Sequence, residues 1–167
     1  ASRSWNFGDC TTSTATNPVK TYGVSGTYTV TLTVTDNSGA SATRSGAVTV
    51  NAPGTQTYTN NTDYPINDNA TINSPIRVTG RPGNAPINTP VAVNIVHTYI
   101  GDLRVSLIAP DGSAYVLHNY TGNSADNINQ TYIVNLSSER LNGTWRLRVT
   151  DSSNADTGRI DSWSITF

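Results

Sequence analysis

The feature that most constrains this 167-residue chain is an alternation of apolar and polar residues with a period of two. It is clearest in residues 26–35, 145–150 and 163–167, where an apolar or aromatic residue stands at every second position. Because successive side chains of a strand point to opposite faces of a sheet, each run predicts one face for a core and one for solvent. No segment has a sustained 3.6-residue apolar period, so the sequence predicts an all-β protein.

The composition narrows the class of partner. Ten of the eleven acidic residues are Asp and nine of the ten basic residues are Arg, a bias that suits strands, turns and oxygen-ligand sites better than helices. The formal net charge is −1, and the sequence has no cluster of basic residues. We therefore expect neither nucleic acid nor a membrane as a partner. No apolar run approaches the roughly eighteen residues that span a bilayer.

Residues 52–57 separate two strand-rich regions and have no apolar period. We expect them to be a linker between a domain at 1–51 and a domain at 58–167. In the first domain, the run at 26–35 predicts a strand with one face in a core. Turn residues follow it at 36–39, and a returning strand is expected at 47–50.

The second region predicts a jelly-roll β-sandwich built from short strands separated by turn signals. The strands are expected around residues 76–78, 91–97, 103–108, 115–118, 132–136, 145–149 and 163–167. Asp111-Gly112 and Asn142-Gly143 are dipeptides typical of hairpin turns. About 110 residues of this kind bury roughly two-thirds of their unfolded surface, which is enough for an autonomous core.

Two blocks of the second region match a family pattern in the same order. The first contains His97-Thr98, Gly101-Asp102-Leu103 and Ala109-Pro110-Asp111-Gly112, and the second is the closing stretch 141–167. Residues 58–167 thereby resemble the P domain of proprotein convertases, which follows the catalytic domain of kexin-like and furin-like subtilases. The resemblance implies a secreted, extracellular chain whose partner is an upstream protease catalytic domain.

The first region carries a different pattern, Trp5-Asn6-Phe7-Gly8-Asp9 with residues 17–22 behind it. It resembles a PKD domain, an immunoglobulin-like β-sandwich of secreted bacterial hydrolases. The resemblance implies that residues 1–51 are an incomplete sandwich without its N-terminal strands. Cys10 stands where this family normally has Gly, so a positive φ at that turn would strain the backbone.

Catalytic residues are not expected in this chain. His97, His118 and several Ser and Asp residues raise the possibility of a Ser-His-Asp triad, but the backbone motifs that position such triads are absent. His97 is in register with Val93 and Ile95, so we expect a core-face histidine held by a hydrogen bond. We expect His118 to be structural or at the surface, and no peptidase activity from the chain.

Calcium is the cofactor that the aspartates suggest, because it takes six to eight hard oxygen ligands. The candidate ligands are Asp102, Asp151 and Asp156, with Asp126 and Asp161 further out. The resemblance places Asp102 in the Gly-Asp-Leu turn of the family, and it places Asp151 and Asp156 in an Asp-rich loop that ends at Gly158. The alternative is that these side chains cap turns through backbone hydrogen bonds, with Asp161 paired to Arg159 or Arg146.

The sequence therefore predicts a non-catalytic accessory region of a secreted protease, most simply a subtilisin-like serine peptidase. Its expected role is to stabilise or regulate the catalytic domain, with a metallopeptidase as the second choice for that domain. The alternative is a binding module that anchors a hydrolase to insoluble protein or polysaccharide, such as collagen or chitin, through some of the tyrosines. Most tyrosines alternate with apolar residues, which favours half-buried positions over binding.

Overall fold

The computed structural model describes residues 1–51 and 54–167, and these residues fold almost entirely into strands. The described part contains one short 3-10 turn, η1 (Ile100–Asp102), and no α-helix. It divides into two compact units, Ala1–Gly54 and Thr55–Phe167. The predicted all-β class is confirmed. Residues 52 and 53 of the expected linker lie outside the described residues. None of the described segments is a helix of the length and hydropathy that would cross a membrane.

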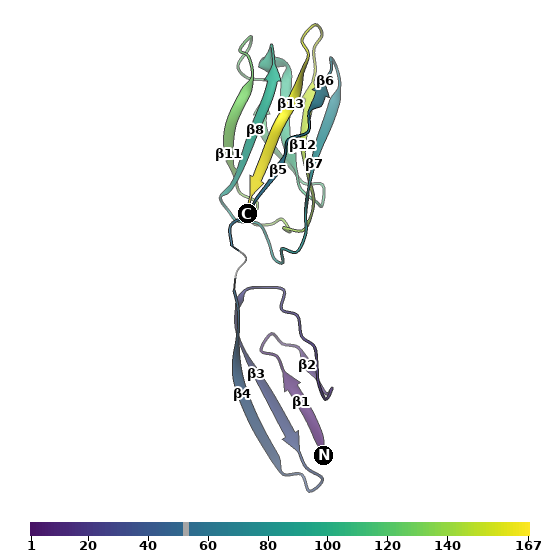
Figure 1. Cartoon of the computed structure of the whole chain (residues 1–167), viewed down its shortest axis with the longest axis vertical. Coiled ribbons are helices and arrows are strands. Elements are labelled where there is room, and N and C mark those ends of the chain that lie inside the picture. Colours follow the sequence, from purple (N-terminus) through teal and green to yellow (C-terminus); the bar gives the residue numbers. More distant parts are fainter. Residues whose placement is uncertain (52–53) are drawn as a thin grey trace. The chain divides into compact units, whose positions relative to one another are not determined.

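The first unit is one antiparallel sheet (Figure 1) with the strand order β2-β1-β3-β4. Its strands are β1 (Ser2–Asn6), β2 (Thr12–Ser13), β3 (Gly26–Thr35) and β4 (Ser41–Val50). The predicted strand at 26–35 is confirmed. The returning strand begins at Ser41, earlier than predicted, because Thr and Ser hydroxyls pair across β3 and β4, as Thr31 and Ser45 do at 2.8 Å.

The apolar face of this sheet is only partly covered. Among the described residues of the unit, Phe7 is the one buried hydrophobic side chain. Leu32 is half-buried, and Val34 and Val48 are each 41% exposed. The prediction that strand 26–35 places one face in a core is therefore wrong in this structure, since a single sheet supplies no second layer.

A tight turn follows β1. Gly8 has a φ of 77°, and a Cβ at this position would lie 2.7 Å from the carbonyl oxygen of Thr29, so only glycine fits there. Cys10 has a φ of 66° and an exposed side chain. The left-handed backbone at Cys10 is strained for a non-glycine residue, as the resemblance to PKD domains suggests.

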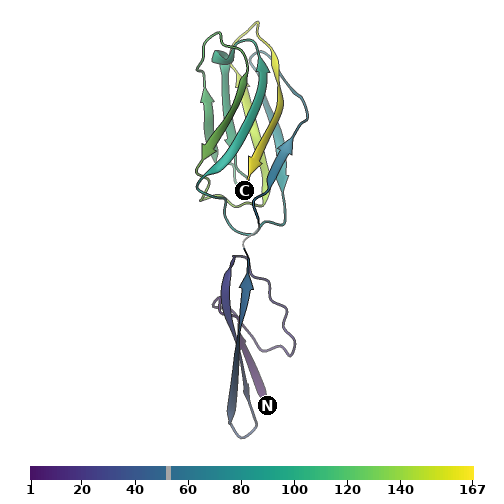
Figure 2. The ribbon, with the colours of Figure 1, turned by 60° about the vertical axis from the view of Figure 1, so that its left-hand side comes forward.

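The second unit is a sandwich of two antiparallel sheets that face each other (Figure 2), and the short strand β6 pairs with one of them at its edge. One sheet has the order β10-β9-β12-β7, and the other has the order β11-β8-β13-β5, with β6 also pairing with β13. The strands are β5 (Thr57–Asn60), β6 (Tyr64–Ile66), β7 (Thr71–Val78), β8 (Thr89–His97), β9 (Leu103–Ile108), β10 (Ala114–Asn119), β11 (Ile128–Val134), β12 (Gly143–Asp151) and β13 (Gly158–Thr166).

The core lies between the two sheets and follows the predicted alternation. Trp145, Leu147 and Val149 of β12 are fully buried. On β13 a register shift between Ile160 and Ser162 moves the inward positions from Ile160 to Trp163, so both are buried although they stand three residues apart. The inner faces of both sheets thus supply one continuous apolar core.

Several predicted boundaries differ from the structure. Thr57 belongs to β5 and not to the linker, because it pairs with Thr166. Asp111-Gly112 does turn the chain between β9 and β10, with a φ of 101° at Gly112. Asn142-Gly143 is not a hairpin turn, because the strands on either side of it, β11 and β12, lie in different sheets. The interval between the strands expected at 145–149 and 163–167 is shorter than predicted, since β12 ends at residue 151 and β13 begins at residue 158.

Candidate functional site

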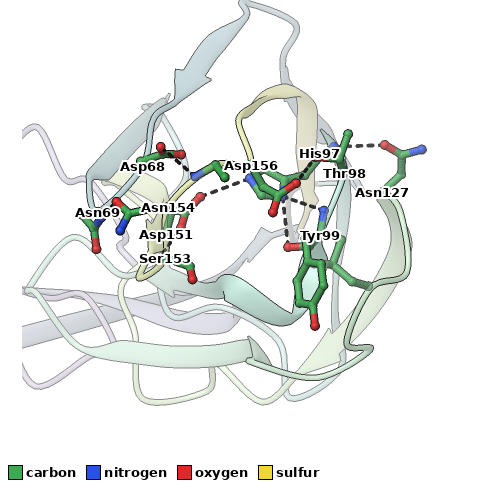
Figure 3. A network of polar contacts seen from close by, with 12 residues as sticks. Asp68, Asn69, His97, Thr98, Tyr99, Asn127, Asp151, Ser153, Asn154 and Asp156 are labelled. Atoms are coloured by element: carbon green, nitrogen blue, oxygen red, sulfur yellow. Dashed lines mark hydrogen bonds and ion pairs between the residues drawn. The ribbon is translucent and has the colours of Figure 1, made fainter.

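Two of the polar side chains that the sequence singles out, those of His97 and Asp151, meet where β8 and β12 end (Figure 3). His97 is the last residue of β8 and Asp151 is the last residue of β12, and each is 1% exposed. His97 Nε2 lies 3.1 Å from Asp151 Oδ2. Because β8 and β12 belong to opposite sheets, this hydrogen bond ties the two layers of the sandwich together.

Both nitrogens of the His97 ring have partners. Asp151 accepts the proton of Nε2, and in the neutral ring Nδ1 accepts the backbone N–H of Tyr99 at 3.2 Å. A doubly protonated ring would donate from Nδ1 to the Tyr99 carbonyl oxygen at 3.1 Å instead. Neither state leaves a ring nitrogen to take a proton from a hydroxyl group, as a general base must. The expectation of a hydrogen-bonded core histidine is confirmed.

Asp151 and Gly158 complete this inter-sheet tie. The second oxygen of Asp151, Oδ1, accepts the backbone N–H of Ser153 at 2.9 Å, so both carboxylate oxygens are bonded. Gly158 pairs with His97 in the ladder of β13 and β8. A Cβ on Gly158 would lie 2.1 Å from the Val96 carbonyl oxygen and 2.7 Å from the His97 ring. Glycine is therefore required for β13 to pass over this histidine.

The four predicted metal ligands do not come together. Asp156 Oδ1 accepts the hydroxyl of Thr98 at 2.8 Å, and Asp126 is exposed. Asp102 is half-buried in η1, where its carbonyl oxygen accepts the backbone N–H of Ser152. In residues 1–51 and 54–167, no three His, Cys, Asp or Glu side chains are grouped so as to hold a metal ion. The arrangement does not fit a four-carboxylate calcium site, and calcium binding stays a prediction.

Asp161 is held by protein contacts. It accepts hydrogen bonds from Arg159 Nη2 at 3.1 Å and from Asn94 Nδ2 at 3.0 Å. Of the two arginine partners considered from the sequence, Arg159 is the one observed. An exposed pair of this kind contributes little to stability.

Sequence reasoning missed two parts of this network. Asn127 Oδ1 accepts the backbone N–H of His97 at 3.0 Å, and the backbone N–H of Asn127 donates to the His97 carbonyl oxygen. Asp68 Oδ2 accepts the backbone N–H of Ala155, while its buried Oδ1 has no hydrogen-bond partner among the described residues. The contacts join segments 30 and 87 residues apart in the chain, so no local pattern could have indicated them.

A second polar cluster lies near the opposite end of β9. Glu139 is 4% exposed and accepts the Tyr115 hydroxyl at 2.5 Å and the Ser138 hydroxyl at 3.2 Å. The hydrogen bond to Glu139 raises the pKa of Tyr115 above its ordinary value, because it favours the protonated phenol.

His118 is also structural, with Nε2 donating to the Ile100 carbonyl oxygen at 2.9 Å.

Comparison with known families assigns both units. Residues 88–167 match the family described as the proprotein convertase P-domain, and residues 1–51 match the PKD domain. Among solved structures, the serine protease of Aeromonas sobria superposes on 83% of this chain with a TM-score of 0.53 and 16% sequence identity. The match covers 36% of that protease and shows a common fold.

Two bacterial relatives are similar in sequence. Leupeptin-inactivating enzyme 1 of Streptomyces exfoliatus is 56% identical over 124 residues, which is 73% of this chain and 28% of that enzyme. The transglutaminase-activating metalloprotease of Streptomyces mobaraensis is 44% identical over 144 residues, which is 84% of this chain and 19% of that protein. The chain thus spans less than a third of the length of each of these relatives.

Proposed function

Because residues 1–51 form a PKD domain and residues 88–167 form a proprotein convertase P-domain, we propose that the chain is a non-catalytic accessory region of a secreted protease. The observation that carries the proposal is the His97–Asp151 pair, whose nitrogen and oxygen atoms are all bonded inside the sandwich. A His-Asp pair in this state stabilises a fold and has no free nitrogen with which to activate a nucleophile.

The accessory role is stabilisation of the catalytic domain. A sandwich with a continuous core folds as a unit, and docking such a unit against a neighbouring domain raises the stability of the native form of both. Sites of local unfolding in the protease would then open less often, which slows autolysis.

For the catalytic domain itself, a subtilisin-like serine peptidase is our first proposal, because P domains follow subtilases. A metallopeptidase is the second, and the name of the Streptomyces mobaraensis relative favours it. Inhibition of the full-length enzyme distinguishes the two: a serine-directed acylating inhibitor abolishes activity in the first case, and a zinc chelator does so in the second.

Deletion tests the accessory role. Removal of residues 55–167 from the full-length protease is expected to shorten the half-life of activity at elevated temperature and to leave the catalytic constants of the surviving enzyme nearly unchanged. The 167-residue chain alone is expected to cleave no peptide substrate. Peptidase activity of the isolated chain, or an unchanged half-life after the deletion, would contradict this proposal.

A second candidate function is anchoring to insoluble polymer, and an observation in the first unit favours it. Tyr22 and Tyr28 stack with ring centroids 4.0 Å apart, and a groove of about 450 Å³ is lined by Trp5, Phe7 and Tyr22. Retention of the chain on collagen, chitin or cellulose in a pull-down assay would support anchoring. Loss of that retention in a Trp5→Ala variant would place the contact in this groove.

A further inference from the structure

The outer face of sheet β10-β9-β12-β7 carries four arginines. Their neighbours in sequence are buried in the core, so the alternation of the strands directs all four outward. Three are exposed and one is half-buried. They are Arg77 on β7, Arg104 on β9, and Arg146 and Arg148 on β12. We call this set the arginine face.

The strand register places the Cα atoms of the four arginines in successive rows along β12. Arg77 stands opposite Thr144 and Arg104 stands opposite Thr150, with Arg146 and Arg148 at the two rows between. Same-face residues of a strand are about 6.8 Å apart, so the four rows extend over about 20 Å. The arginines therefore form one diagonal line across three strands.

Among the described residues, no carboxylate forms an ion pair with this line. Among the residues of β7, β9, β10 and β12, the one acidic residue is Asp151, and its side chain points inward to His97. In the described part of the chain, none of the four arginines takes part in an ion pair. Arg148 Nε donates only to the neutral amide oxygen of Asn73, at 3.2 Å.

A groove of about 500 Å³ lies at the Arg148 and Arg104 end of the line. Its lining includes Arg104 and Arg148, with the side chains of Asn73, Ser106 and Thr150 between them. Like charges so close on one sheet face repel each other and lower stability. A bound anion would relieve this repulsion, and the neighbouring hydroxyl and amide groups would add hydrogen bonds to it.

We propose that the arginine face binds an extended protein segment that carries Asp or Glu at alternate positions. An extended chain repeats its same-side residues at the same spacing of about 6.8 Å, so its carboxylates would meet the rows of Arg77, Arg146, Arg148 and Arg104 in turn. Arg suits this task because its planar fork binds a carboxylate with two parallel hydrogen bonds.

The charges around the arginine face favour a short acidic segment over nucleic acid. Residues 55–167 contain seven Arg, eight Asp and one Glu, so their formal charge is 7 − 9 = −2. Asp102 lies next to the Arg104 end of β9, and Asp111 lies next to its other end. A long polyanion would run past both carboxylates, whereas a segment about 20 Å long ends at the Arg104 row and does not continue over Asp102.

Fluorescence anisotropy with two peptides of equal composition tests the proposal on the 167-residue chain. One labelled peptide alternates Glu with Ser, and the other places all its Glu residues in one block before the Ser residues. We expect the alternating peptide to bind about tenfold more tightly at low salt, since only it matches all four rows. Equal affinities for the two peptides would overturn the match in spacing.

Single arginine substitutions test where on the chain the acidic peptide binds. Arg148→Gln is expected to weaken binding of the alternating peptide about tenfold, while the thermal midpoint stays the same or rises because one repelling charge is gone. Arg159→Gln is the matched control, because Arg159 lies on β13 and already pairs with Asp63 and Asp161. Binding unaffected by Arg148→Gln, or tighter binding of a single-stranded oligonucleotide than of the peptide, would overturn the proposal.

Discussion

The two units of this chain share one sequence pattern and differ in how much of it they bury. In the second unit the alternating apolar residues of β12 and β13 face each other across a sandwich and are fully buried. In the first unit the equally regular run of β3 lies in a single sheet, and Val34 remains 41% exposed. Alternation therefore predicts a strand and its two faces, but a second sheet is what converts one face into a core.

The largest expected difference between the units comes from truncating one tryptophan in each. Trp145→Ala is expected to cost about 3–5 kcal/mol, because the side chain is fully buried and packs on Phe167 with ring centroids 5.3 Å apart. Trp5→Ala is expected to cost about 1 kcal/mol or less, because Trp5 is only half-buried. Urea unfolding followed by circular dichroism measures both, and equal costs would contradict the comparison.

A smaller difference is expected from adding a methyl group to one glycine in each unit, and the two variants should change stability in opposite directions. Gly158→Ala is expected to cost about 1–3 kcal/mol, because its Cβ would collide with the Val96 carbonyl oxygen and the His97 ring. Gly46→Ala on β4 has open space and is expected to stabilise by about 0.5 kcal/mol. Thermal melts of the two variants check the signs, and a neutral Gly158→Ala would show that β13 does not pass tightly over His97.

The Tyr115–Glu139 hydrogen bond predicts a pH effect confined to the second unit. The pKa of Tyr115 is raised in the folded state, so this bond stabilises the fold fully below pH 10.0, and the stabilisation is lost as pH rises through the folded pKa. Glu139→Gln is expected to lower that pKa toward its ordinary value. An ultraviolet titration of the wild type, Glu139→Gln and Tyr115→Phe measures the shift, and identical tyrosine titrations would contradict it.

Calcium is expected to give the smallest effect. The carboxylates of Asp151 and Asp156 already accept hydrogen bonds from protein groups and do not converge with Asp102 and Asp126. A saturating addition of calcium is therefore expected to raise the thermal midpoint by no more than about 2 °C relative to a chelated sample. A rise clearly above 2 °C would contradict this expectation and show that calcium binds more tightly than these carboxylates predict.

Local pattern predicted more of the fold than of the sites. The strand at 26–35 and the buried side chains of β12 followed from alternation alone, and the positive φ at Cys10 was raised by the resemblance to PKD domains, which have Gly at that position. The His97–Asp151 bond joins two sheets across 54 residues, so only the packed sandwich reveals it.

The arginine face shows the same limit of sequence reasoning. The sequence has no cluster of basic residues, so no binding partner could be inferred from its charges. Its four arginines come from β7, β9 and β12 and form one line only because these strands are neighbours in the sheet. Patterns within a strand are visible in sequence, whereas patterns across strands depend on register.

The measurement that tests the account most directly is an Asp151→Ala substitution in the full-length protease. It leaves His97 Nε2 buried without its acceptor, so we expect a loss of about 2–3 kcal/mol in stability and a shorter half-life of activity, with kcat on the surviving enzyme unchanged. Asp63→Ala, which removes an exposed pair with Arg159, is the control and should change neither quantity measurably. A fall in kcat of about a hundredfold or more with an unchanged half-life would identify the pair as catalytic and contradict the account.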